Sequence, residues 1–197
     1  MITLYLASKS PRRKQLLQQL GIEFEVVDVN IDETPGSAEA AIDYVRRISL
    51  EKALACRTRV KKELPVLAAD TEVVLDGRIL SKPVTMKDAV EMLLSLSGRD
   101  HLVYTAVTLL RSTPDIVVSS NRVWFRTLTR EECVAYCNNY HPLDKAGAYG
   151  IQDMAAGFVS RFEGSYSSVM GLPLLETAKL LGVRKLRSSI PGVKLLR

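Results

Sequence analysis

Apolar and polar residues follow two periods along the chain, and segments of the two kinds alternate. Alternating or continuous apolar runs predict strands at residues 2–7, 23–29, 66–75, 102–110 and 116–127. Apolar residues three or four positions apart predict helices at residues 11–20, 38–60, 85–96 and 172–181, with one more starting at Thr129. This mixture predicts an α/β fold with a central mixed twisted sheet flanked by helices.

Local signals place several boundaries of these elements. Asp76-Gly77 is a strong turn signal, so the strand at residues 66–75 is expected to return as a hairpin. Thr129 is followed three residues later by Glu132, a capping-box pattern. The 197 residues show no repeat or Pro/Gly-rich linker, which indicates one domain, or two small lobes that share a core.

The composition, with 47% hydrophobic and 25% charged residues, is typical of soluble globular proteins. No apolar run approaches the ~18 residues that cross a bilayer. The short apolar stretch at residues 2–7 is not preceded by a basic region, as a signal peptide would be. We therefore expect a cytoplasmic protein that makes no contact with the membrane.

The three cysteines are too few, and odd in number, for a disulfide framework. Cys133, Cys137 and His141 follow one another at a spacing of four, which is compatible with metal ligands. However, Pro142 falls where the helix should already have ended, and no fourth ligand is evident. Structural cysteines are the favoured interpretation.

The formal net charge of +5 raises the question of nucleic-acid binding. Five cations lie in the last fifteen residues, which contain no acid: Arg184, Lys185, Arg187, Lys194 and Arg197. Without these five the rest of the chain is neutral. The basicity thus belongs to a C-terminal tail at residues 183–197, for which solvation is the usual explanation.

Four cations crowd the start of the helix predicted at residues 11–20, where Ser10 suits the N-cap: Lys9, Arg12, Arg13 and Lys14. A helix N-terminus carries about half a positive charge, so each cation there is unfavourable by ~0.3–1 kcal/mol. Free backbone N–H groups and guanidinium donors together make a natural phosphate site. An ordinary capped helix with solvated arginines is the alternative.

Two further charged residues interrupt apolar surfaces. Lys52 lies at the centre of the apolar face of the helix at residues 38–60, so it either extends to water or meets a buried anion. Asp70 follows the buried run 66–69, whose two small alanines leave room beside it. An acid at the tip of a buried strand suits a metal ligand or a general base, and a loop-capping aspartate is the alternative.

Glu33, Lys82 and the glycine-punctuated loop at residues 144–152 are weak signals when each is taken alone. Together with the residues above, they give several cations accompanied by a few carboxylates. That combination favours metal–phosphate chemistry.

These segments resemble the Maf family of nucleoside triphosphate pyrophosphatases over nearly the whole chain, from Leu4 to about Leu181. The motifs are Leu6-Ala7-Ser8-Lys9-Ser10-Pro11-Arg12-Arg13, Asp32-Glu33, Glu51-Lys52-Ala53, Ala69-Asp70-Thr71, Lys82-Pro83, Leu96-Ser97-Gly98 with His101, Asp144-Lys145-Ala146-Gly147-Ala148-Tyr149 with Ile151-Gln152, and Gly164-Ser165-Tyr166 with Gly171-Leu172-Pro173. Several ordered motifs at consistent spacing make the resemblance specific.

The resemblance implies a fold like that of inosine triphosphate pyrophosphatases, with residues 1–182 forming one catalytic domain whose two lobes enclose a cleft. It also implies a homodimer and a divalent metal cofactor, Mg²⁺ or Mn²⁺. Asp70 matches the proton acceptor, and Glu33 matches a second carboxylate near the metal. We therefore assign Asp70 and Glu33 as the expected metal-side residues.

The resemblance also assigns the substrate side. Ser8, Arg13, Lys52 and Lys82 match phosphate-side positions, with the two lysines acting in catalysis. Arg12, Thr71 and Gln152 match the branch that acts on dTTP and UTP, not the branch that acts on 7-methyl-GTP, and are expected to read the base. The implied reaction is attack of water on the α-phosphorus, which yields the monophosphate and pyrophosphate and removes non-canonical nucleotides.

Lys9 and Asp153 depart from the family pattern, because glycine is common at both positions. If those glycines have positive φ, the loops of this chain must bend differently.

Two alternative functions compete with the enzyme. A nucleic-acid-binding module is suggested by the basic tail and the arginine cluster, but the rest of the chain is neutral and only 6% of residues are aromatic. A regulatory protein of cell division is the other alternative. The sequence favours the enzyme over both.

Overall fold

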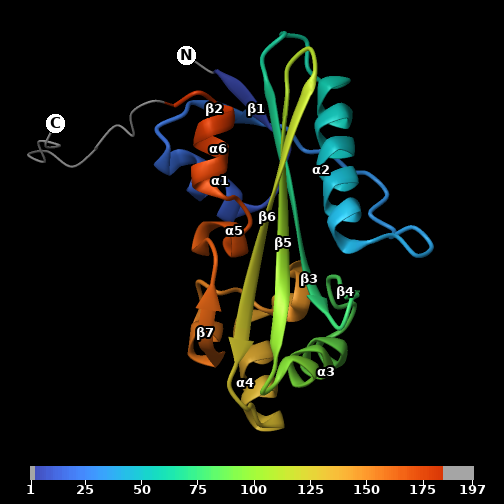
Figure 1. The fold of residues 1–197 in the computed structure, drawn as a ribbon, viewed down its shortest axis with the longest axis vertical. Helices are drawn as coiled ribbons and strands as arrows, with labels where there is room; N and C mark the ends of the chain where they lie inside the picture. The colour runs from blue at the N-terminus through green and yellow to red at the C-terminus, as the bar shows by residue number, and fades with distance from the viewer. Residues whose placement is uncertain (1–2, 184–197) are drawn as a thin grey trace, which may run out of the picture.

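The computed structural model describes residues 3–183, which form one mixed seven-stranded sheet with helices on both faces (Figure 1). The strand order is β2-β1-β3-β5-β6-β7, and β4 pairs with β3. The strands are β1 (Leu4–Leu6), β2 (Phe24–Val26), β3 (Val66–Leu75), β4 (Arg78–Leu80), β5 (Asp100–Leu110), β6 (Pro114–Phe125) and β7 (Val159–Glu163). β1 runs parallel to β2 and β3, whereas the other pairs are antiparallel. The predicted α/β fold with a mixed sheet is confirmed.

The helices gather around the long strands (Figure 1): α1, α5 and α6 on one side of their upper half, α2 on the other, and α3 and α4 at the lower end. Their bounds are α1 (Pro11–Gln19), α2 (Ala41–Arg57), α3 (Met86–Leu96), α4 (Arg130–Tyr140), α5 (Tyr166–Met170) and α6 (Leu174–Leu180). Both α3 and α4 begin with a capping box, the second formed by Thr129 and Glu132 as predicted.

The alternation of side chains along β1 and β3 separates two parts of the core. Leu6 of β1 and Leu67 of β3 pack with Leu17 of α1 on one face. On the other face, Tyr5 and Val66 pack with residues of α2. Even-numbered residues of β3 therefore face α2, and odd-numbered residues face α1.

Several predicted boundaries differ from those observed. The helix expected at residues 38–60 is shorter, because Ala38 has a φ of 60° and cannot belong to a right-handed helix. The final helix begins after Pro173, which occupies its N-cap. β7 and α5 were not predicted, since their sequences have no clear apolar period. Asp70 lies in the middle of β3 and not at its tip, because β5 pairs with β3 on both sides of it.

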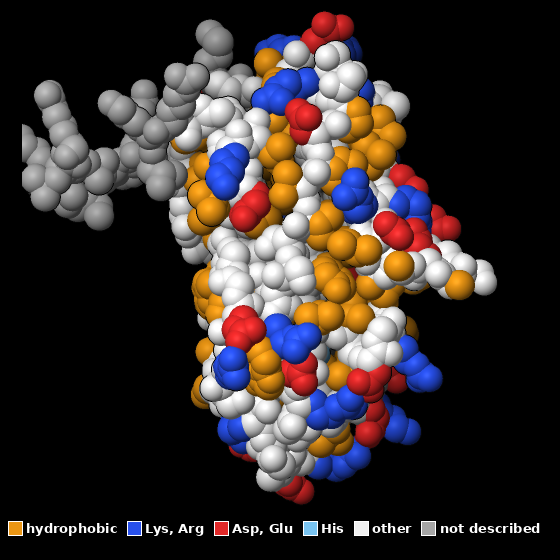
Figure 2. Space-filling model, in the orientation of Figure 1, with side chains coloured by type: hydrophobic (Ala, Val, Ile, Leu, Met, Phe, Trp, Pro, Cys, Tyr) orange, Lys and Arg blue, Asp and Glu red, His pale blue; other side chains and the backbone are white. Residues whose placement is uncertain are grey.

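Charged side chains of both signs are interspersed on the face shown in Figure 2, without a continuous basic surface. Within residues 3–183, none of the helices combines the length and apolar character that a bilayer crossing requires. The predicted basic tail lies, apart from Val183, outside the described residues. Cys133 and Cys137 are buried in the core beside α3, and burial raises the pKa of Cys133 to about 11.

Candidate active site

Along one edge of β3, the central residues have no neighbouring strand within the described part of the chain. β1 pairs with β3 at Val66 and Leu67, and β4 pairs with it only from Val73 to Leu75. Between these two pairings, the edge of β3 around Asp70 faces a pocket of about 530 Å³. The carboxyl end of β1 and the N-terminus of α1 open into the same pocket, and such positions favour phosphate binding.

All nine residues expected in the site line this single pocket: Ser8, Arg12, Arg13, Glu33, Lys52, Asp70, Thr71, Lys82 and Gln152. The lining includes six cationic residues and four carboxylates. The excess of cations matches a ligand that carries several negative charges.

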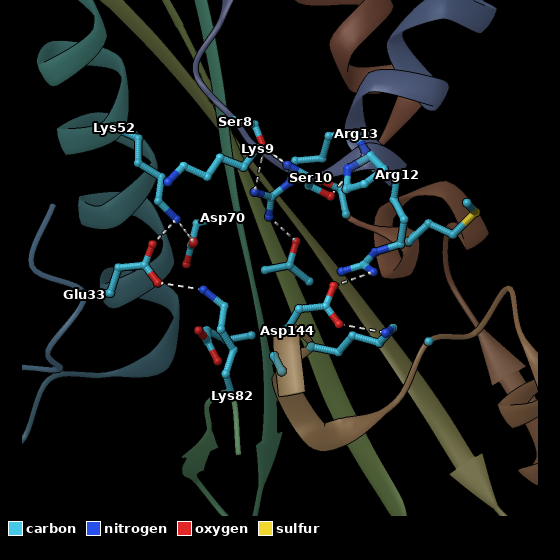
Figure 3. Close-up of a pocket in the computed structure, with 18 of the residues that line it drawn as sticks. Ser8, Lys9, Ser10, Arg12, Arg13, Glu33, Lys52, Asp70, Lys82 and Asp144 are labelled. Carbon is cyan, nitrogen blue, oxygen red and sulfur yellow. Dashed lines mark hydrogen bonds and ion pairs between the residues drawn. The ribbon is translucent and has the colours of Figure 1, made fainter. Parts of the chain in front are cut away.

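Lys52 extends from α2 toward Asp70 and Glu33 (Figure 3). It is buried on α2, and its Nζ lies 2.7 Å from Asp70 Oδ1 and 2.7 Å from Glu33 Oε1. Of the two interpretations of this lysine, the buried anion is therefore correct. Asp70 faces α2 because it is an even-numbered residue of β3.

Glu33 contacts both Lys52 and Lys82. Its second oxygen, Oε2, accepts a hydrogen bond of 2.9 Å from Lys82 Nζ, and the Tyr44 hydroxyl donates to the Glu33 carbonyl at 2.7 Å. Partial burial disfavours the Glu33 carboxylate, but the hydrogen bonds and charges of Lys52 and Lys82 prevail and lower its pKa to about 2. Glu33 is therefore ionised at neutral pH.

Arg13 forms hydrogen bonds with three other residues that line the pocket. Its Nε donates to the Gly171 carbonyl at 2.8 Å, and its terminal nitrogens donate to Thr71 Oγ1 at 3.2 Å and Ser8 Oγ at 3.5 Å. Burial lowers the pKa of Arg13, although Asp70 opposes this shift. The guanidinium thus positions three chain segments while adding positive charge to the pocket.

The mouth of the pocket is framed by α1 and the loop after α4. Arg12 donates to Asp144 at 3.1 Å, and Asp144 also accepts a hydrogen bond of 2.7 Å from Lys145 (Figure 3). Gln152 lies on the same rim with an exposed side chain. Its amide offers both a donor and an acceptor to a ligand.

The two departures from the family pattern cause no backbone strain. The residues with positive φ do not include Lys9, and Asp153 has an extended φ of −106°. Asp153 accepts a hydrogen bond from the backbone of Ala155 and so caps a short 3₁₀ turn. Lys9 extends to Asp28 at the surface, 2.9 Å away.

Glu72 is a pocket residue that was not predicted from the sequence. It lies two residues after Asp70, lines the same pocket and is only 5% exposed. Burial, reinforced by the nearby Asp70 charge, raises the pKa of Glu72 to about 9. The period of two along β3 was the signal, because it places Asp70 and Glu72 on one face.

The buried carboxylates offer free oxygens to a divalent cation. Asp70 Oδ2 and Glu72 Oε2 are both buried without a hydrogen-bond partner, and carboxylate oxygens are the ligands that Mg²⁺ and Mn²⁺ prefer. Among residues 3–183, no three His, Cys, Asp or Glu side chains form a ready-made cation site. The donors therefore fit a cation that takes its other ligands from water and substrate phosphates, as Mg²⁺ usually does.

A mixed sheet, a helix N-terminus at its edge and a pocket rich in lysine and arginine together define a phosphate-binding type of α/β protein. Comparison with known families narrows this class: the Maf-like protein family matches residues 3–183. The chain belongs to the Maf-like protein family.

Similar proteins share most of the chain. A dTTP/UTP pyrophosphatase of Methylobacillus flagellatus is 47% identical over 196 residues, which cover 98% of each chain. A protein of the same name from Escherichia coli is 49% identical over 183 residues, or 92% of each chain. Among solved structures, the Ham1 protein of Staphylococcus aureus matches with a TM-score of 0.44 and 16% identity, over 61% of this chain and 69% of that chain. Similarity at this last level says nothing about substrate.

Proposed function

We propose that this protein hydrolyses dTTP and UTP, and modified pyrimidine nucleotides of the same shape, to the monophosphate and pyrophosphate. The observation that carries the proposal is the buried Lys52 that joins Asp70 and Glu33 inside a pocket lined by six cations. The names of the relatives that share nearly the whole chain support the choice of substrate.

In the proposed reaction, the oxygen of a water molecule forms a bond to the α-phosphorus. The bond between the α-phosphorus and the oxygen that bridges it to the β-phosphorus breaks, and this oxygen leaves as part of pyrophosphate. Asp70 orients this water and accepts its proton. Lys52 and Lys82 neutralise the charge that develops on the phosphate chain, and Arg13 adds charge while holding Ser8 and Thr71 in place. When bound beside Asp70 and Glu33, Mg²⁺ or Mn²⁺ supplies Lewis-acid stabilisation of the phosphate oxygens.

The base is proposed to lie toward Arg12, Thr71 and Gln152. A pyrimidine with two carbonyl oxygens and one N–H between them presents acceptors and a donor, which the Gln152 amide complements. Thr71 is held by Arg13 and by Thr105 Oγ1 at 3.0 Å. A fixed hydroxyl at this point limits the size of the base.

The family resemblance adds two expectations about the protein in the cell, a homodimer and a cytoplasmic location. Light scattering on the purified protein measures the first, and cell fractionation the second. A monomeric mass in solution would contradict the expected homodimer.

The proposal is tested by measuring pyrophosphate release from a panel of canonical and modified nucleotides with Mg²⁺ or Mn²⁺. We expect dTTP and UTP to be the best canonical substrates, the isotope from labelled water to appear in the monophosphate, and chelation of the metal to stop turnover. A preference for 7-methyl-GTP, or label in the pyrophosphate, would contradict it. Salt-sensitive binding to RNA or DNA without turnover would favour the nucleic-acid alternative.

A further inference from the structure

Glu72 is a buried acid in the pocket that the reaction above does not use. It stands two residues after Asp70 on β3, so the two side chains leave the strand on the same face about 7 Å apart. Glu72 is 5% exposed, and its Oε2 has no hydrogen-bond partner among the described residues. A buried carboxyl without partners is costly, which calls for a reason for its presence.

The two lysines nearest these acids form ion pairs with Asp70 and Glu33 and not with Glu72. Lys52 lies against Asp70 and Glu33, and Lys82 donates to Glu33. Glu33 thus has both oxygens occupied by ammonium groups at 2.7 and 2.9 Å. By contrast, Asp70 Oδ2 and Glu72 Oε2 are free.

We propose that Asp70 and Glu72 together form the protein's half of the divalent-cation site, and that Glu33 orients the two lysines instead of binding the cation directly. This inference rests on the proposed metal-dependent function. Two carboxylates, completed by water and phosphate oxygens, are the usual protein contribution to a catalytic Mg²⁺ site. The cation would contact Glu72 directly, whereas the ion pairs of Lys52 and Lys82 are with Asp70 and Glu33.

The direct test is Mn²⁺ binding to the metal-free protein in the absence of nucleotide, measured by electron paramagnetic resonance of free Mn²⁺. Glu72→Gln keeps the shape of the side chain and removes the carboxyl group that would bind the cation. We expect this variant to bind Mn²⁺ at least ~10-fold more weakly than the wild type. The matched control is Glu63→Gln, which makes the same substitution at an exposed position outside the pocket and should bind Mn²⁺ like the wild type.

Thermal unfolding provides a second readout that does not depend on turnover. Because Glu72→Gln removes an unpaired buried acid, the metal-free variant should be at least as stable as the wild type. Mn²⁺ should raise the Tm of the wild type and of Glu63→Gln, but not that of Glu72→Gln. A folded Glu72→Gln with unchanged Mn²⁺ affinity, or a wild type that binds no Mn²⁺, would overturn the inference.

The assay of pyrophosphate release, run on the same wild-type preparation, separates this inference from the proposed function. Metal-dependent turnover by the wild type with unchanged Mn²⁺ affinity in Glu72→Gln refutes the role of Glu72 alone. Absence of pyrophosphate release from every nucleotide refutes the function as well.

Discussion

The charge of Lys52 is tolerated between α2 and the sheet because the ammonium group forms ion pairs with two carboxylates. The Lys52 ammonium group makes two contacts of 2.7 Å, and its side chain and that of Asp70 are almost completely buried. A buried ion pair of this kind is not evidence of extra stability, because the cost of removing the charges from water offsets much of their mutual attraction. Its value here is that it fixes the orientation of Asp70.

Replacement of Lys52 by methionine should reveal this dependence. The variant leaves Asp70 buried without its cation, so we expect a loss of roughly 3 kcal/mol in the free energy of unfolding. Urea denaturation measures the loss, with Lys62→Met at an exposed position as the control. If both variants unfold at the same urea concentration, Lys52 does not stabilise a buried anion.

His101 links the core to the loop at residues 144–152, which contributes Tyr149 to the pocket. It is 2% exposed, its Nε2 lies 2.8 Å from the Tyr149 hydroxyl, and burial lowers its pKa to about 4. In the unfolded chain its pKa is ~6.5. Between these values the unfolded state binds the proton and the folded state does not, so stability falls as the pH drops from about 6.5 toward 4.

The expected result is a loss of roughly 2 kcal/mol between pH 7 and pH 5 from this residue. Urea denaturation of the wild type and of His101→Gln across this range measures it, because glutamine does not titrate. Parallel pH profiles for the two proteins would mean that His101 does not contribute.

At the scale of elements, the gap between β1 and β4 along the edge of β3 creates the pocket. The 3₁₀ turn Ala146–Ala148 packs against β3 at Val73, where the pairing with β4 begins. Gly147 has a φ of 67°, and a Cβ atom there would lie 2.7 Å from Val73 Cγ2. The turn therefore depends on a residue without a side chain.

Gly147→Ala should lower the free energy of unfolding by about 1–3 kcal/mol, because it adds both backbone strain and a clash with β3. It should also raise the KM for UTP, since the same turn carries Lys145 into the pocket. Gly157→Ala is the control, because its Cβ would meet no atom within 4 Å. Equal stability and equal KM in the two variants would show that the contact with Val73 is unimportant.

At the scale of the whole molecule, the sequence predicts the parts with a strong period and misses those without one. The strands of the long hairpin and the helix α3 were predicted close to their observed bounds, and the start of α4 was predicted from its capping box. β7 was missed because it is a partly exposed edge strand with two charged side chains. Its pairing with β6 is a tertiary effect that local patterns do not contain.

The site was predicted as a set of residues, but not as an arrangement. Charged residues at locally unfavourable positions indicated the pocket. Lys52 lies on the apolar face of a helix, and the cations at α1 lie at a positively charged helix N-terminus. The sequence did not show that Arg13 contacts Thr71 and Gly171, because those contacts join segments distant along the chain. Glu72 escaped notice because Asp70 was placed at a strand tip, where alternation does not apply.

Asp70 is proposed to activate the water that attacks the substrate in this pocket. The most direct measurement is the kcat for pyrophosphate release from UTP by Asp70→Asn, with Asp76→Asn, an exposed position on the turn that follows β3, as the control. We expect a ~10²–10⁴-fold lower kcat for Asp70→Asn in a folded protein, and near-normal turnover for the control. Near-wild-type turnover by Asp70→Asn would contradict it.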